Sequence, residues 1–258
     1  MIANIIGKFK QYQFVFEELV KRDFKRKYKR NILGVLWSML APLFTLLVMN
    51  FVFGHIFGRT MPHYIIYLFS GNLLFNYFTE ATNGGMMSLM DNAHIFSKVK
   101  VPKYLFLFSR VVSSSINFLL TMIVYFIFVA FDGLAFTWKF ILLLFPFGCL
   151  FITILGVGLI LSALYVFFRD IQYLYGIFTT ALMYFTPIFY DISLMGDKAW
   201  VFYCNPLFLY INYVRQIVIY GQIPSLAYHG ACLIYAFALF GIGCLMYKKY
   251  NFKFLYYV

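Results

Sequence analysis

Six long apolar stretches, separated by short polar connections, occupy most of the chain. None of them alternates apolar and polar residues, which favours membrane helices over the strands of a membrane barrel. Each is near or above the roughly 20 residues that a helix needs to cross the hydrocarbon layer. The predicted spans are residues 33–57, 64–90, 104–131, 140–168, 171–190 and 226–247. The pattern predicts an all-α integral membrane protein with a six-span domain over residues 33–258.

The second predicted span contains the only acidic residue inside any of the six. Its uncharged part ends at Thr79, and full length is reached only by including Glu80 and the pair Gly84-Gly85. Glu80 marks either a functional site or a position near the cytoplasmic end of a long helix. The second interpretation is favoured, because Asp91 begins the next polar connection only eleven residues later.

Two segments outside the spans have patterns of their own. In residues 1–32, apolar side chains recur every three or four positions among Lys, Arg, Glu and Gln: Phe9, Tyr12, Phe16, Val20, Phe24 and Tyr28. This predicts an amphipathic helix over residues 5–28 that lies in the cytoplasmic interface. Residues 191–224 mix aromatics with Asn205-Pro206 and Arg215. They fit short re-entrant helices on the outer side better than a span or a soluble loop.

Composition and charge support this picture and orient it. The chain is 63% hydrophobic and only 12% charged, against about 25% charged in soluble domains. Seven of the ten residues at 21–30 are Lys or Arg, and such clusters beside a first span stay in the cytoplasm. Of the 21 Lys and Arg, only four fall on the opposite side: Arg59, Lys139, Lys198 and Arg215. Both termini are therefore predicted to be cytoplasmic.

The sequence carries no motif of an enzyme that acts alone. It contains no G-x-x-x-x-G-K-[ST] phosphate loop, no H-E-x-x-H and no G-x-S-x-G. The four cysteines have no metal-ligand spacing: Cys149, Cys204, Cys232 and Cys244. We predict no catalytic residue, no metal site and no cofactor in the chain.

Aromatic residues are unusually abundant, with 34 Phe, 22 Tyr and 3 Trp. Most are expected to face lipid or to form interfacial belts. Some could instead line a passage and stack on sugar rings. The candidates are Tyr173, Tyr175, Tyr184, Phe185, Tyr203, Phe208, Tyr210 and Tyr213. The sequence alone leaves both possibilities open.

The order of these features resembles one family, the membrane subunits of type-2 ABC transporters in the branch that exports O-antigen, capsule, rhamnan and teichoic acid. The resemblance covers about residues 14–220. It is carried by ELVKRDFKRKYKRNILGVLWSMLAP, NYFTEATNGGMMS, residues 92–102, VFFRDI, YFTPIFY, and Asn205-Pro206 followed by Arg215.

The resemblance implies a homodimer that works with two copies of a separate ATPase, which binds ATP and Mg. The ATPase-coupling residues would be Asn92, His94, Phe96, Lys98, Lys100, Pro102, Arg169 and Asp170. The substrate would be a lipid-linked glycan, moved across the bacterial plasma membrane. A basic cytoplasmic surface for its headgroup would consist of Lys21, Arg22, Lys25, Arg26, Lys29 and Arg30. The passage or gate would include Tyr184, Pro187, Tyr203, Tyr210 and Arg215.

Two other functions are compatible with the pattern. A multidrug or small-lipid exporter of the same architecture would favour an apolar cavity over aromatics with polar neighbours. An ATP-independent channel or secondary transporter would need no ATPase partner, although no internal repeat typical of secondary transporters is evident. The glycan, its lipid carrier and the type of cell envelope are not encoded in any motif.

Overall fold

The computed structural model describes residues 2–29, 32–57, 61–96, 98–99, 101–251 and 253–255, and all regular elements among them are helical. The α-helices are α1 (Ile2–Tyr28), α2 (Trp37–Phe57), α3 (Tyr64–Asp91), α4 (Ala93–Phe96), α5 (Tyr104–Phe131), α6 (Leu144–Phe167), α7 (Ile171–Phe185), α8 (Pro206–Val218) and α9 (Leu226–Tyr250). Short 3₁₀ helices are η1 (Gly34–Leu36), η2 (Trp138–Leu143), η3 (Ile192–Cys204) and η4 (Lys253–Leu255).

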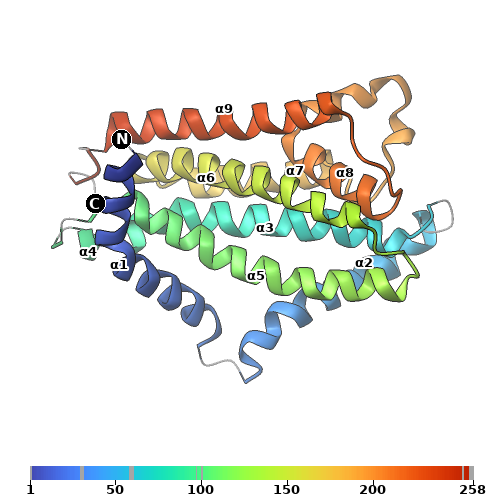
Figure 1. Cartoon of the computed structure of the whole chain (residues 1–258), viewed down its shortest axis with the longest axis horizontal. Helices are drawn as coiled ribbons and strands as arrows, with labels where there is room; N and C mark the ends of the chain where they lie inside the picture. The colour runs from blue at the N-terminus through green and yellow to red at the C-terminus, as the bar shows by residue number, and fades with distance from the viewer. Residues whose placement is uncertain are drawn as a thin grey trace.

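Helix α3 is the centre of the bundle, and it packs against α2, α5, α6, α7 and α8 (Figure 1). Most of its side chains are buried. Four other segments of the described chain are long and apolar enough to cross a membrane: Gly34–Gly54, Tyr104–Phe131, Trp138–Phe167 and Leu226–Tyr250. Helix α3 is as long as α5, but its polar residues set it apart from these four.

The two ends of the bundle differ. Figure 1 shows α1, α4 and the last turns of α9 at one end, and α8 at the other. Helix α6 runs toward the α1 end, so the exposed Arg169-Asp170 turn that follows it lies there too. The loop between α5 and η2 lies at the α8 end. The structure therefore gathers α1, α4 and the α6–α7 turn on one side of the molecule.

The fifth predicted span is not helical throughout. Helix α7 ends at Phe185 instead of Tyr190 and has 15 residues, which is about 22 Å of helix against a hydrocarbon layer of about 30 Å. The cause is Pro187, which has no backbone N–H and disfavours helix at the residue before it. Residues 191–224 contain η3 and α8, two short helices joined at Asn205.

Glycines set the closest helix contacts. A Cβ atom on Gly156 of α6 would lie 2.5 Å from the backbone of Leu239 in α9. A Cβ on Gly243 would lie 2.5 Å from the carbonyl oxygen of Gly156. Since real Cβ atoms do not approach backbone so closely, only glycine at both positions lets α6 and α9 pack at this distance.

Candidate functional site

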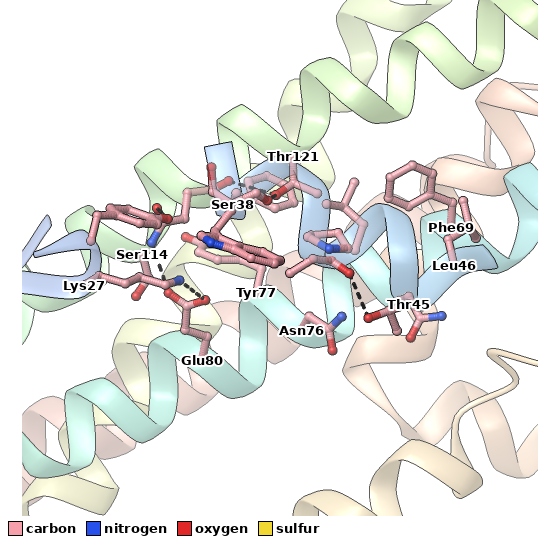
Figure 2. Close-up of a pocket in the computed structure, with 18 residues that line it drawn as sticks. Lys27, Ser38, Thr45, Leu46, Phe69, Asn76, Tyr77, Glu80, Ser114 and Thr121 are labelled. Carbon is pink, nitrogen blue, oxygen red and sulfur yellow. Dashed lines mark hydrogen bonds and ion pairs between the residues drawn. The ribbon is translucent and has the colours of Figure 1, made fainter. Parts of the chain in front are cut away.

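A groove of about 390 Å³ lies between α2, α3 and α5, beside the end of α1 (Figure 2). Eighteen described residues line it, and twelve of them carry a polar group on the side chain: Lys27, Tyr28, Trp37, Ser38, Thr45, Asn72, Asn76, Tyr77, Glu80, Ser114, Asn117 and Thr121. Figure 2 shows Lys27 and Glu80 at one end and Phe69 and Leu46 at the other. Glu80 and Phe69 are eleven residues apart in α3, so the groove extends about 16 Å along that helix.

Helical spacing explains why these residues share one surface. Asn72, Asn76 and Glu80 recur every four residues in α3, with Phe69 and Tyr77 beside them. Side chains spaced three or four residues apart lie on one face of a helix. Two further sets complete the lining: Ser114, Asn117 and Thr121 from α5, and Ser38 and Thr45 from the start of α2.

One end of the groove is closed by interactions with α1. Lys27 Nζ lies 2.8 Å from Glu80 Oε2, and Asn117 Nδ2 donates to Glu80 Oε1 at 3.2 Å. Tyr28 donates its hydroxyl hydrogen to Asn117 Oδ1 at 2.6 Å. Burial raises the pKa of the Tyr28 phenol, and the Glu80 carboxylate adds to the rise, so Tyr28 remains a donor at neutral pH. These contacts join α1, α3 and α5 at Glu80, a position well inside α3.

A second pocket, lined by charged residues, continues from this end. It shares Lys27, Glu80, Ser114 and Asn117 with the groove and adds Asp23, Arg26, Asp91, Arg110 and Ser113. Asp23 is only 3% exposed and accepts from Arg22 Nη2 at 2.7 Å, while Arg110 Nη1 lies 3.9 Å away. Gly84 makes room for Arg110, because a Cβ there would lie 2.9 Å from Arg110 Nε.

Several polar groups of the groove have capacity left for a ligand. Asn76 is exposed, and its amide has no hydrogen-bond partner among the described residues. Ser38 and Thr45 donate to carbonyl oxygens of their own helical turns, at 2.6 and 2.9 Å. Their hydroxyl oxygens still offer lone pairs. In Figure 2, Asn76 and Thr45 project from α3 and α2 into the groove.

The predicted passage residues Pro187 and Arg215 lie elsewhere, in a buried polar cluster on the α8 side of the bundle. Arg215 is 1% exposed and donates to the carbonyl oxygens of Pro187 (2.6 Å), Ile188 (3.2 Å) and Tyr67 (3.0 Å). Its guanidinium carbon lies 3.3 Å from the centroid of the Tyr67 ring. We call this the Arg215 cluster; its members are Tyr64, Tyr67, Ser70, Gly71, residues 186–190, Asn205 and Arg215.

The Arg215 cluster satisfies the backbone where α7 stops. Tyr64 donates to the carbonyl oxygen of Phe189 at 2.9 Å, and Tyr67 donates to that of Tyr190 at 2.8 Å. Four successive carbonyl groups, 187–190, therefore have side-chain donors from α3 or α8. Asn205 caps α8 by accepting from Leu207 N and donates to Thr186 Oγ1 at 2.9 Å. Non-helical backbone at membrane depth is tolerated only when its polar groups are satisfied in this way.

The predicted passage tyrosines separate into two groups. Tyr210 is fully buried, and its hydroxyl lies 2.8 Å from Thr153 Oγ1 and 3.3 Å from the Cys232 carbonyl oxygen. In the single chain, the Tyr210 ring and hydroxyl are therefore used within the protein, and its contact with a sugar chain stays a prediction. Pro187 and Arg215, predicted for the passage or gate, are likewise buried. Tyr184 and Tyr203 are exposed, at 62% and 46%. The other aromatic candidates divide likewise: Tyr175, Phe208 and Tyr213 are buried, and Tyr173 and Phe185 are exposed.

A family model described as ABC-2 type transporter matches residues 15–219 of the sequence. The chain belongs to the ABC-2 type transporter family. An O-antigen export system permease protein RfbA of Klebsiella pneumoniae is 27% identical over 247 residues, covering 93% of this chain and 95% of the relative. An RfbA protein of Myxococcus xanthus is 28% identical over 200 residues, covering 77% and 76%. The polysialic acid transport protein KpsM of Escherichia coli is 24% identical over 221 residues, covering 84% and 86%.

The matched region of this ABC-2 protein contains the predicted ATPase-coupling residues. His94, Lys98, Arg169 and Asp170 are exposed at the α1 end of the bundle. Asn92 is instead 4% exposed, and its amide donates to the Ser88 carbonyl oxygen at 2.7 Å, so it ends α3 and faces the protein interior. Pro102 is half-buried. The side chain of Phe96 and all of Lys100 lie outside the described residues.

The predicted basic surface lies on α1 of the ABC-2 protein. Lys25, Arg26 and Lys29 are exposed, Lys21 pairs with Glu18 at 2.9 Å, and Arg22 pairs with Asp23. Arg30 lies outside the described residues. The apolar face of α1 packs partly on the bundle through Tyr12, Val15, Phe16 and Leu19. Within the described residues, no group of three or more His, Cys, Asp or Glu side chains is placed to hold a metal ion.

Proposed function

We propose that this chain is the membrane subunit of an ATP-driven exporter that moves a lipid-linked cell-surface polysaccharide across the bacterial inner membrane. The observation that carries the proposal is the match to O-antigen export permeases over 93% of the chain, at 27 and 28% identity. The polysialic acid transport proteins, at 23 and 24% identity, are similar over 84% of it. Relatives that carry different glycans favour polysaccharide export over export of a drug or a small lipid.

The groove is the site that we assign to the sugar chain. The exposed ring of Trp37 and the exposed amide of Asn76 line the same space as the largely buried Tyr77 and Asn72. Sugar rings present C–H faces that lie well on aromatic rings, and their hydroxyl groups bond to amides and hydroxyls. A groove that offers many moderate contacts suits a polymer that slides past. The exposed Tyr184 and Tyr203 remain candidates for contacts on the outer side.

Six spans are the topology that we propose for this chain. Four segments qualify by length and hydropathy alone. Helix α3, with 28 residues and a largely buried surface, adds one more span at the centre of the bundle. Helix α7 provides the remaining span, which continues through the non-helical residues 186–190 into the re-entrant η3 and α8. With α1 and its basic residues on the cytoplasmic side, α8 lies on the outer side.

A homodimer with two ATPase subunits completes the proposed assembly. Helices α2 and α7 carry exposed apolar residues suited to a second copy: Phe44, Leu47, Val48, Phe51, Tyr173, Leu174, Ile177 and Phe178. The chain has no phosphate-loop motif, so ATP and Mg are bound by the partner. His94, Lys98 and the Arg169-Asp170 turn, all exposed at the α1 end, form the proposed contact with that partner.

The basic residues of α1 are proposed to hold the anionic headgroup of the lipid carrier. Lys25, Arg26 and Lys29 are exposed beside the charged pocket that continues into the groove. Cationic side chains near the cytoplasmic leaflet attract phosphate groups. A carrier held here would place its sugar chain at the Lys27–Glu80 end of the groove.

Deletion of the gene tests the proposed function. Export should stop, so the glycan should disappear from the cell surface and accumulate inside, and the wild-type chain supplied in trans should restore it. A variant of the partner ATPase that cannot hydrolyse ATP should give the same accumulation. Normal surface glycan in the deletion strain, with loss of a small lipid or drug-efflux activity instead, would contradict the proposal.

A further inference from the structure

The groove is electrically neutral. Among the described residues that line it, Lys27 is the only base and Glu80 the only acid, and they pair with each other at 2.8 Å. All other polar lining groups are amides, hydroxyls or an indole. The Lys27 ammonium group is thus already paired with the Glu80 carboxylate. A ligand in the groove encounters no uncompensated charge from these lining residues.

Two arginines elsewhere in the bundle also lie beside groups of the protein itself. Arg215 is buried and donates to backbone carbonyl oxygens, and Arg110 Nη1 lies 3.9 Å from Asp23 Oδ1 in the charged pocket. Residues 33–58, which include α2, contain no Asp, Glu, Lys or Arg, and residues 171–190, which include α7, contain none either. These two helices carry the exposed apolar residues proposed for contact with a second copy, so a dimer joined there would add no cation to a passage between them.

We propose that the groove selects an uncharged, hydroxyl-rich sugar polymer and discriminates against polyanionic chains such as polysialic acid or polyol phosphates. This inference rests on the proposed function and names the substrate class of the same site. Pores that carry anions or phosphates line their paths with Arg and Lys, because each negative charge needs a counter-charge where water is scarce. A neutral sugar needs only hydrogen-bond partners and ring faces, which the exposed Asn76, Thr45 and Trp37 supply.

The Lys27–Glu80 pair has a defined role in this neutrality. Glu80 accepts from both Lys27 and Asn117, so it holds the ammonium group at the wall of the groove. Replacing Glu80 with Gln would release one positive charge next to the bound polymer. The pair therefore keeps the headgroup end, which is basic, distinct from the sugar path, which is neutral.

The chemistry of the native polymer is the first test. The glycan that accumulates inside the deletion strain is purified, and the charge of its repeat unit is determined by ion-exchange chromatography and NMR. A repeat without carboxylate or phosphate is expected. An anionic repeat would overturn the inference while leaving the proposed exporter function intact. If no glycan accumulates, the proposed function fails, and the inference fails with it.

Binding by charge variants is the second test. The chain, purified with its ATPase in lipid nanodiscs, is offered a neutral mannose oligosaccharide and an oligosialic acid of equal length. Wild type should prefer the neutral probe by at least about tenfold. Asn76→Lys should narrow or reverse this preference, whereas Asn76→Gln, which stays neutral, should keep it. Asn83→Lys adds the same charge to α3 outside the groove lining and should also keep it.

The outcomes of the binding test separate the two levels of the proposal. Equal affinity of wild type for both probes, or tighter binding of oligosialic acid, would overturn the neutral-polymer inference but retain a glycan site. An unchanged preference in Asn76→Lys would show that selection occurs outside the groove. Binding of neither probe would remove the groove as the sugar site altogether.

Discussion

The groove and the Arg215 cluster are both polar and both lie among apolar helices, but their polar groups are used differently. In the Arg215 cluster, Ser70 and Thr186 are fully buried, Arg215 is 1% exposed, and each has hydrogen-bond partners within the protein. In the groove, Asn76 and Glu80 are exposed, and the Asn76 amide is unused by the described residues. The polar groups of the Arg215 cluster have hydrogen-bond partners within the chain, whereas the groove retains polar groups that a ligand could bind.

This difference separates polar residues that hold the fold from polar residues that can meet a substrate. A buried polar group without a partner is costly, so the break at residues 186–190 requires every donor that the cluster provides. An exposed amide that faces a groove does not need a hydrogen-bond partner within the protein. Polar residues that stand out in the sequence therefore include both kinds: some stabilise the fold and others are available to a substrate. Only their burial and their hydrogen bonds show which role each one has.

The largest expected effect is on stability, in the Arg215 cluster. Arg215→Met should leave the carbonyl groups of Pro187 and Ile188 without their guanidinium donor, at a cost of about 3 kcal/mol. Folded protein in the membrane should fall, with a lower melting temperature in detergent and loss of export. Arg215→Lys should be intermediate, since Lys cannot donate in a fork to several acceptors. Normal melting of Arg215→Met would show that the cluster does not hold the break.

Tyr210→Phe should have a smaller effect of the same kind. The substitution keeps the buried ring and removes the hydroxyl that lies near Thr153 and the Cys232 carbonyl oxygen, at a cost of about 1 kcal/mol. Export per folded molecule should be unchanged. Export reduced several-fold at a normal melting temperature would return Tyr210 to the passage. Tyr184→Leu is the exposed counterpart, and it should leave the melting temperature unchanged.

Much of the fold follows from the sequence because polar connections bound the apolar stretches. The predicted span 104–131 coincides with α5, and 64–90 differs from α3 by one residue. The predicted fifth span extends past the end of helix α7, because Pro187 interrupts a stretch that remains apolar beyond it. The partner of this break, Arg215, lies 28 residues further along the chain, and only the packing of α8 on α3 brings the two together.

The groove was missed although its signal is present in the sequence. Asn72, Asn76 and Glu80 recur at intervals of four, and polar residues at this spacing indicate which face of a helix turns toward polar surroundings. Aromatic residues gave no such indication, because they occupy every face. The sequence therefore located Glu80 but not the surface to which it belongs.

The smallest effect on stability is expected in the groove, together with a specific loss of transport. Asn76→Leu replaces an exposed amide without a partner, so the free energy of unfolding should change by less than about 0.5 kcal/mol. Export of the glycan should nevertheless fall, because the groove loses a hydrogen-bonding group and gains apolar bulk. Matched levels of protein and of copurified ATPase are the controls. Full export would argue that the groove does not contact the polymer.

The most direct measurement is photo-crosslinking between the chain and its glycan during ATP turnover. A photoreactive amino acid is placed at residue 76 in the groove, at residue 184 on the exposed outer surface, or at residue 210 in the core. The account predicts crosslinks to the glycan from residue 76, dependent on ATP hydrolysis, and none from residue 210. Crosslinks from residue 210 with none from residue 76 would contradict it.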